Sequence, residues 1–137
     1  MKIYFAGSIR AGRDDKDLYL DIIKHLQNHG QVLTEHIGDI ENMPTADQNK
    51  TDEYIYQRDM DWIKEADIVV AEVTQPSLGV GYELGWADGK KPIIYLYREQ
   101  EGKRLSAMLS GNKGMNVFNY KDLEEAKKIL DTYFKDK

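Results

Sequence analysis

Three short runs of apolar, β-branched and aromatic residues constrain the fold of this chain more than any other feature. They are KIYFAG at residues 2–7, DIVVAEV at 67–73 and PIIYLY at 92–97. Runs this apolar, without polar alternation, are typical of strands that are buried on both faces of a parallel sheet. Two weaker runs, QVLT at 31–34 and MNVFNY at 115–120, bring the number of predicted strands to five.

Helical patterns separate these strands. Apolar residues recur at helical spacing over residues 18–26, and amphipathic helices are predicted over about 52–65 and 122–134, with a further helix after the glycine-rich turn near residue 79. Alternating strands and helices predict an α/β fold: a doubly wound, flavodoxin- or Rossmann-like five-stranded parallel sheet with helices on both faces. A length of 137 residues fits a single domain over residues 1–137.

Composition excludes several classes of function. The net charge is −5 and no basic stripe stands out, which argues against nucleic-acid binding. The chain has no cysteine, so thiolate chemistry and disulfides are excluded, and a cytoplasmic location is expected. No apolar run approaches the length of a membrane span, so no membrane partner is expected. A small-molecule ligand remains the expected partner.

The segment GSIRAGR, residues 7–13, directly follows the first predicted strand, where ligands of such folds bind. Its glycines have the spacing of a phosphate-binding loop, but Arg13 and Asp14 replace the required Lys and Ser/Thr. Exposed backbone N–H groups, the Ser8 hydroxyl and the charges of Arg10 and Arg13 still favour an anion. The alternative is a tight turn with solvated arginines, and we expect anion binding.

The segment GVGYELG, residues 79–85, does not match a dinucleotide fingerprint, because its spacing is one residue too long and it follows the wrong strand. Gly79 and Gly81 indicate instead that a ligand approaches the backbone closely. Ser77, which follows Pro76, is a predicted helix N-cap. Capping and ligand contact are compatible, since a helix N-terminus also favours an anion.

Two carboxylates are candidates for chemistry. Asp59 falls on the same helix face as Ile55 and Ile63, and an inward carboxylate is costly unless it is paired. It is therefore either part of a buried salt bridge or a cap, with Arg10 or a backbone N–H as a possible partner, or an active-site group. Glu83 is either an ordinary exposed glutamate or a group that points into the site. Two carboxylates on one pocket are the minimum set for glycosyl chemistry.

Two further residues are open to more than one interpretation. Tyr4 is either a core aromatic residue or a ligand contact, and His36 is either a polar loop residue or a ligand contact. No Cys, His or carboxylate cluster shows metal-ligand spacing, so the sequence predicts no metal.

Four segments together resemble a known enzyme family: YFAGSIRAGR, VLTEH, DMDWIKEADIVVAEVTQPSLGVGYELGWA and RLSAM. They are similar to the 2′-deoxynucleoside 5′-phosphate N-hydrolases of the nucleoside 2-deoxyribosyltransferase superfamily. The resemblance extends from residue 1 to the last predicted helix, except for residues 39–50. It implies hydrolysis of the N-glycosidic bond of 2′-deoxynucleoside 5′-monophosphates to a free nucleobase and 2-deoxyribose 5-phosphate, with no metal or cofactor.

The resemblance also implies roles for individual residues. Glu83 is the expected nucleophile, which forms a covalent glycosyl-enzyme, Asp59 the second carboxylate, and Tyr4 the group that holds the sugar and the nucleophile. Ser106 matches a serine that reaches the phosphate of the neighbouring subunit's substrate, which implies a homodimer. The positions predicted to bind substrate, with the phosphate contacts at residues 8, 10 and 77 among them, are Gly7, Ser8, Ile9, Arg10, Gly12, Arg13, His36, Ser77, Gly79, Ser106 and Met108.

Two other functions stay open. A nucleoside 2-deoxyribosyltransferase would use a second base in place of water, but a free nucleoside has no phosphate to occupy the predicted arginine and serine contacts. A non-catalytic nucleotide-binding module would use the same loops and would have no need of two inward carboxylates.

Overall fold

The computed structural model describes residues 1–9, 12–36 and 50–136, and for residues 13 and 14 the backbone only. Of the helices in these segments, none combines the length and apolar character that a bilayer crossing requires. The elements in chain order are β1 (Lys2–Gly7), α1 (Arg13–Leu26), β2 (Gln31–Leu33), α3 (Asp52–Glu65), β3 (Ile68–Glu72), α4 (Leu78–Ala87), β4 (Ile93–Tyr97), α5 (Ala107–Ser110), β5 (Asn116–Asn119) and α6 (Leu123–Lys135).

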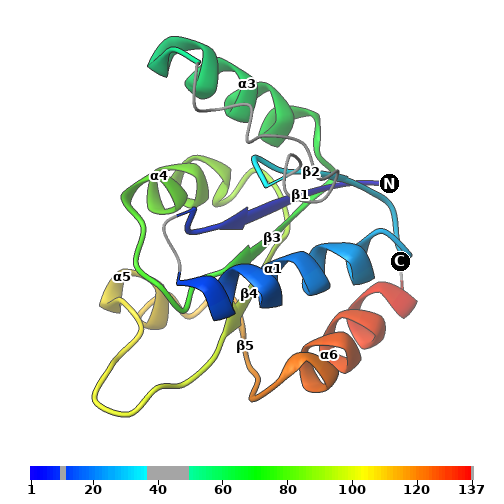
Figure 1. The fold of residues 1–137 in the computed structure, drawn as a ribbon, viewed down its shortest axis with the longest axis vertical. Coiled ribbons are helices and arrows are strands. Elements are labelled where there is room, and N and C mark those ends of the chain that lie inside the picture. The colour runs from blue at the N-terminus through cyan, green and yellow to red at the C-terminus, as the bar shows by residue number, and fades with distance from the viewer. Residues whose placement is uncertain (10–11, 37–49, 137) are drawn as a thin grey trace.

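Within the described residues, five strands form one parallel sheet in the order β2-β1-β3-β4-β5 (Figure 1). This is the flavodoxin-like order, in which the chain switches direction across the sheet between β1 and β3. The predicted fold class is confirmed. The two weaker strands are shorter than the sequence predicts, because β2 ends at Leu33 and β5 spans only Asn116–Asn119.

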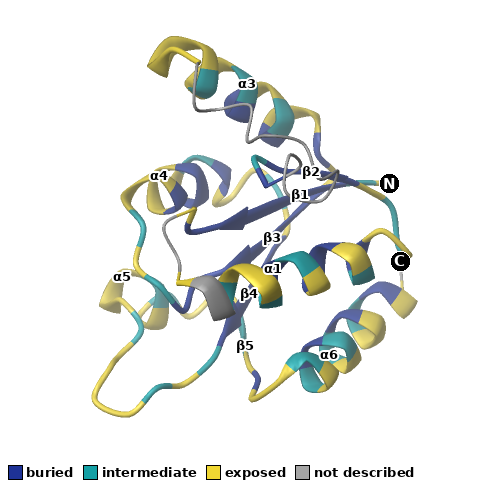
Figure 2. Ribbon diagram, in the orientation of Figure 1, coloured by how far each residue is buried: buried dark blue, intermediate teal, exposed yellow. Residues whose placement is uncertain are grey.

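Helices cover both faces of the sheet. In Figure 1, α1 and α6 lie on one side of the strands, and α3 and α4 lie on the other. Ile3 and Phe5 of β1 pack under α1 and α6, whereas Tyr4 and Ala6 pack under α3 and α4. Figure 2 shows that β1, β3 and β4 are buried while the helices expose their outer faces. Because successive strand residues point to opposite faces, Tyr4 can point only toward α3 and α4.

Side-chain caps fix where α3, α4 and α6 begin. The Thr51 hydroxyl accepts a hydrogen bond from the Tyr54 N–H at 3.1 Å, and the Ser77 hydroxyl accepts one from the Val80 N–H at 3.3 Å. Asp122 caps α6 in the same manner. Ser77 therefore has the capping role predicted for it, and it places the N-terminus of α4 directly after the carboxyl end of β3.

A buried polar network closes the carboxyl ends of β3 and β4. Glu72 is fully buried and accepts hydrogen bonds from the Thr74 N–H at 2.7 Å, from the Thr74 hydroxyl at 2.9 Å and from the Tyr120 hydroxyl. Thr74 Oγ1 also accepts the Arg98 N–H at 2.9 Å. Burial raises the pKa of Glu72, and these donors partly offset that effect.

The same network reaches the start of α1. The Arg98 guanidinium pairs with Asp15 at 2.5 Å, and the Gln75 side chain donates a hydrogen bond to the other Asp15 oxygen at 2.9 Å. Asp15 lies in the first turn of α1, so the start of α1 is anchored to the segments that follow β3 and β4. This anchoring was not predicted from the sequence.

Removing one donor from Glu72 tests the network. We expect Tyr120→Phe to lower the free energy of unfolding by about 1–3 kcal/mol, because a buried carboxylate loses a hydrogen bond. Urea denaturation followed by circular dichroism measures the change. Tyr95→Phe is the matched control, since the Tyr95 hydroxyl is buried with no hydrogen-bond partner in the described part of the chain. Equal losses in both variants would contradict a specific role for the Tyr120 hydroxyl.

Candidate active site

Three elements bring the predicted catalytic residues together. Tyr4 is in the middle of β1, Asp59 on α3 and Glu83 on α4, and all three side chains are buried. Glu83 shares the inward face of α4 with Val80 and Ala87, where an apolar residue is the usual choice. Its burial rules out the interpretation as an ordinary exposed glutamate.

A third carboxylate, Glu35, completes the cluster. It lies two residues after the end of β2, and one oxygen each from Glu35, Asp59 and Glu83 lie within 4.8 Å of one another. Glu35 was not among the site residues predicted from the sequence. Its position after a strand end and next to the predicted contact His36 is the signal that could have indicated it. We call the three residues the carboxylate cluster.

Arg58 supplies a positive charge at the edge of the carboxylate cluster. Its Nε and terminal nitrogen both lie 2.9 Å from Asp59 Oδ1, and its guanidinium lies over the Trp62 ring at 4.8 Å. Asp59 is therefore salt-bridged and is also part of the cluster, while its role as an active-site group stays a prediction. The pairing residue is Arg58, whereas the possible partner Arg10 lies outside the described residues.

Burial dominates the electrostatics of the cluster. Burial raises the pKa of Glu83 to about 7; the Tyr4 hydroxyl and Arg58 oppose the shift, and Asp59 adds to it. Burial raises the pKa of Glu35 to about 8, assisted by repulsion from Asp59 and Glu83 and by a hydrogen bond with Asp59. At neutral pH, Glu83 is partly ionised, and Glu35 retains a proton that it shares with Asp59.

Tyr4 and Glu83 leave polar atoms without a regular partner. The two groups interact closely enough for the tyrosine to lower the pKa of Glu83, and burial together with Glu83 raises the pKa of Tyr4. Yet in the described residues neither Tyr4 Oη nor Glu83 Oε2 has a partner at regular hydrogen-bond geometry. Buried polar atoms in this state are available to a ligand.

A cavity of about 430 Å³ lies between α3 and α4, with Asp59, Glu83 and Gly79 in its lining. Its walls include Tyr56 and Tyr82, whose ring centroids are 6.2 Å apart in an edge-to-face arrangement. Aromatic walls above a few convergent polar groups suit a planar ligand with a polar centre. Gly79, which the sequence analysis predicts to lie close to a ligand, therefore lines the same cavity as Asp59 and Glu83.

A second cavity, of about 690 Å³, lies between α4 and α5. Ser77, Ser106 and Met108 all line it, so three of the predicted substrate-binding residues share one space. Ser106 also caps α5, since its hydroxyl accepts the Met108 N–H at 3.2 Å. Leu78 and Met108 are highly exposed there, at 94% and 82% of their surface.

The remaining predicted contacts lie beyond the end of β1. Ser8 is buried, whereas Ile9 and Gly12 are exposed. Arg10 and the side chain of Arg13 lie outside the described residues.

His36 supports the turn that β1 enters. Its Nε2 lies 3.3 Å from the Gly7 carbonyl oxygen, which accepts the hydrogen bond, and its ring meets the edges of Phe5 and Tyr19. A Cβ at Gly7 would lie 3.1 Å from both aromatic rings, so only glycine fits without displacement. His36 is only 4% exposed, and its hydrogen bond to Gly7 holds the residue at which the predicted anion-binding segment begins.

The three carboxylate oxygens could in principle hold a cation, because they converge within 4.8 Å. The raised pKa values of Glu35 and Glu83 instead favour protons in that space. The expectation of a metal-free site stays a prediction.

The pKa of Glu83 generates a test based on folding. A carboxyl group whose pKa rises on folding stabilises the native state at low pH, and this contribution is lost as pH rises through about 7. Glu83→Gln should therefore raise the free energy of unfolding by about 1–3 kcal/mol at pH 8.5 and change it little at pH 5. Urea denaturation at both pH values measures this. Glu124→Gln, which alters an exposed side chain, is the control. A destabilised Glu83→Gln at pH 8.5 would contradict the assignment.

Comparison with known proteins identifies the family. Residues 3–126 match the family described as nucleoside 2-deoxyribosyltransferase. A 5-hydroxymethyl-dUMP N-hydrolase of Tetraodon nigroviridis is 48% identical, over 98% of this chain and 97% of that protein. The mouse protein of the same name, from Mus musculus, is also 48% identical, over 96% of this chain and 79% of its own.

A solved structure of the Clostridium botulinum CMP N-glycosidase BcmB has the same fold. Its TM-score is 0.70 at 23% identity, and the match covers 97% of this chain and all (100%) of that chain. The resemblance read from the sequence is thus confirmed over nearly the whole chain. This chain belongs to the nucleoside 2-deoxyribosyltransferase family.

Proposed function

We propose that this protein is an N-glycosidase that hydrolyses 2′-deoxynucleoside 5′-monophosphates to a free nucleobase and 2-deoxyribose 5-phosphate. The observation that carries the proposal is the burial of Glu83 beside a second carboxylate, Asp59, at the floor of a cavity. Relatives that are 48% identical carry the name 5-hydroxymethyl-dUMP N-hydrolase, so this nucleotide is the first substrate to test.

In the proposed reaction, ionised Glu83 attacks C1′ of the deoxyribose, the C1′–N bond breaks and the nucleobase leaves with the bonding electron pair. Water then hydrolyses the glycosyl ester and regenerates the carboxylate. Enzymes that use such a double displacement place two carboxyl groups about 5–5.5 Å apart. One oxygen of Glu83 and one of Asp59 lie within 4.8 Å of each other, which supports this route. The Tyr4 hydroxyl then orients the nucleophile and the sugar.

Glu35 and Asp59 carry the proton that the departing base requires. Glu35 keeps a proton near neutral pH and forms a hydrogen bond with Asp59, so the pair can deliver one proton to the leaving base. The pair then accepts a proton from the attacking water in the second step. Arg58 limits the accumulation of negative charge as these protons move, because it binds Asp59 directly.

The 5′-phosphate is proposed to bind at the junction of the β1 loop and the N-terminus of α4. Ser8 directly follows β1 and Ser77 caps α4, and Arg10 is predicted to add positive charge. The first N–H groups of α4 favour a phosphate, because they lack partners within the helix. A transferase that acts on free nucleosides would have no use for these donors.

We further propose a homodimer in which Ser106 contacts the phosphate in the partner's site. The exposed apolar side chains of Leu78 and Met108 beside Ser106 support this proposal, because a second copy would bury them.

A substrate panel tests the reaction. With 5-hydroxymethyl-dUMP and the ordinary deoxynucleoside monophosphates, chromatography should detect free base, whereas the corresponding free deoxynucleosides should react at least about 10³-fold more slowly in kcat/KM. Each lost charge-assisted hydrogen bond costs roughly 1.5–3 kcal/mol. Glu83→Gln should lower kcat by roughly 10³–10⁶-fold.

Two outcomes of the panel would contradict the proposal. If free deoxynucleosides react equally well and an added base captures most of the sugar, the protein is a transferase. If no nucleotide releases base although equilibrium dialysis shows binding, it is a nucleotide-binding module.

Subunit mixing tests the shared site. Glu83→Ala and Ser106→Trp proteins should each be inactive, but a mixed dimer contains one site with both native residues. Equal mixing should restore roughly a quarter of the parent activity, measured as base release after confirmed subunit exchange. Two batches of Glu83→Ala mixed together are the control. Activity that fails to return after exchange would place Ser106 outside the partner's site.

A further inference from the structure

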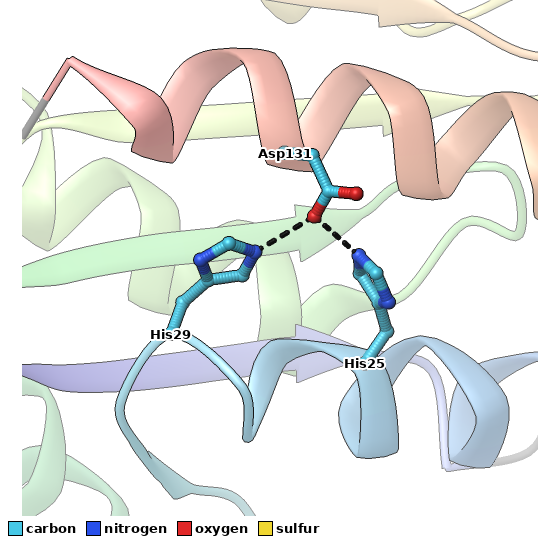
Figure 3. Close-up of side chains that lie close together, drawn as sticks. All are labelled: His25, His29 and Asp131. Carbon is cyan, nitrogen blue, oxygen red and sulfur yellow. Dashed lines mark hydrogen bonds and ion pairs between the residues drawn. The ribbon is translucent and has the colours of Figure 1, made fainter.

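Two histidines and an aspartate converge on the face of the sheet opposite the carboxylate cluster. His25 lies in the last turn of α1, His29 in the turn that follows it, and Asp131 on α6 (Figure 3). Asp131 is 102 residues from His29 in the sequence, so only the packing of α6 against α1 brings them together.

The three side chains point at one place. His25 Nε2 lies 2.6 Å and His29 Nε2 lies 2.8 Å from the same oxygen, Asp131 Oδ1. The His29 ring stacks on Phe134 with centroids 4.8 Å apart, and it meets the His25 ring edge-to-face at 5.7 Å. The histidine side chains are only 14% and 22% exposed, whereas Asp131 is 54% exposed. Packing therefore fixes the rings and leaves the carboxylate free to adjust.

We propose that His25, His29 and Asp131 bind a divalent transition-metal ion, Zn²⁺ foremost, that links the end of α1 to α6. Two imidazole nitrogens and one carboxylate oxygen are a donor set that zinc accepts, with a fourth position for water. Imidazole donors favour Zn²⁺, Cu²⁺ or Ni²⁺ over Mg²⁺ and Ca²⁺. The sequence analysis overlooked the four-residue spacing of His25 and His29, which can place two ligands on one side of a helical turn.

The required adjustment is small. Zinc bonds of about 2.0–2.2 Å place tetrahedral ligand atoms roughly 3.3 Å apart. His25 Nε2 and His29 Nε2 lie 2.6 and 2.8 Å from Asp131 Oδ1, so this oxygen has to withdraw from the rings by about 0.5–0.7 Å. All three ligand atoms lie within 4.8 Å of one another, so the two imidazole nitrogens have to approach each other by at most about 1.5 Å. The metal takes the place of the Nε2 protons, which are released on binding.

Calorimetric titration of the tag-free full chain, first dialysed against a chelator, tests the site with Zn²⁺ as the probe. We expect one saturable Zn²⁺ per chain, a higher melting temperature with Zn²⁺, and no comparable effect of Mg²⁺. His25→Gln, His29→Gln and Asp131→Asn should each weaken Zn²⁺ binding by at least about tenfold. Glu124→Gln, which removes another carboxylate from α6, should bind Zn²⁺ as the parent does.

Two further measurements keep the inference open to refutation. Glu83→Gln separates this site from the carboxylate cluster and should leave Zn²⁺ affinity unchanged. If a histidine variant fails to fold, the ¹⁵N spectrum of the parent protein tests the site instead. Zn²⁺ should shift the Nε2 resonances of His25 and His29 and leave those of the third histidine, His36, unchanged. The absence of saturable binding, Zn²⁺ binding that survives both histidine substitutions, or a shift at His36 alone would overturn the proposal.

Discussion

Hydrogen bonds from both neighbours hold β1 inside the sheet, with Tyr4 opposite Leu33 of β2 and Val69 of β3. This register decides which face receives each side chain, because a slip by one residue would exchange the two faces. Tyr4 is thereby directed toward α3 and α4, and the turn at Gly7 lies next to the end of β3. The cavity, the carboxylate cluster and the anchored start of α1 at Asp15 all depend on this pairing.

The carboxylate cluster works against folding. Three acidic groups lie in a mostly buried space, where Arg58 is the one nearby arginine among the residues that the structure describes. The cluster cannot be fully ionised without a large desolvation cost. The protein accommodates the cluster by keeping a proton on Glu35 and by pairing Asp59 with Arg58. Active sites commonly hold such unfavourable groups where the chemistry requires them. The two apolar cores, one on each face of the sheet, compensate for the free-energy cost of this cluster.

The fold was largely predictable because its determinants are local. Apolar runs without alternation specify buried parallel strands, and the Thr51 and Ser77 caps specify where helices begin. The inward position of Asp59 was predicted from the apolar stripe of its helix. Glu83 was singled out by the motif that carries the family resemblance. Their assigned roles stay predictions.

Contacts between elements were not predictable from local patterns. Glu35 lies in a polar stretch without periodicity, and its proximity to Asp59 depends on how α3 packs over β2 and β1. Arg58 precedes Asp59 in the sequence, but nothing in the pattern shows that its guanidinium folds back onto that residue. Asp131 meets His29 across 102 residues.

Gly7 has a wider consequence for how this protein can change. It is paired with Glu72 in the sheet and is enclosed by the rings of Phe5 and Tyr19, so it belongs both to the apolar core and to the edge of the sheet where a ligand is predicted to bind. Substitutions on the two sides of this position cannot act independently, because each shifts the packing on which the other depends. Adaptation to a new ligand at the β1 loop would therefore require accompanying changes in the core beneath it.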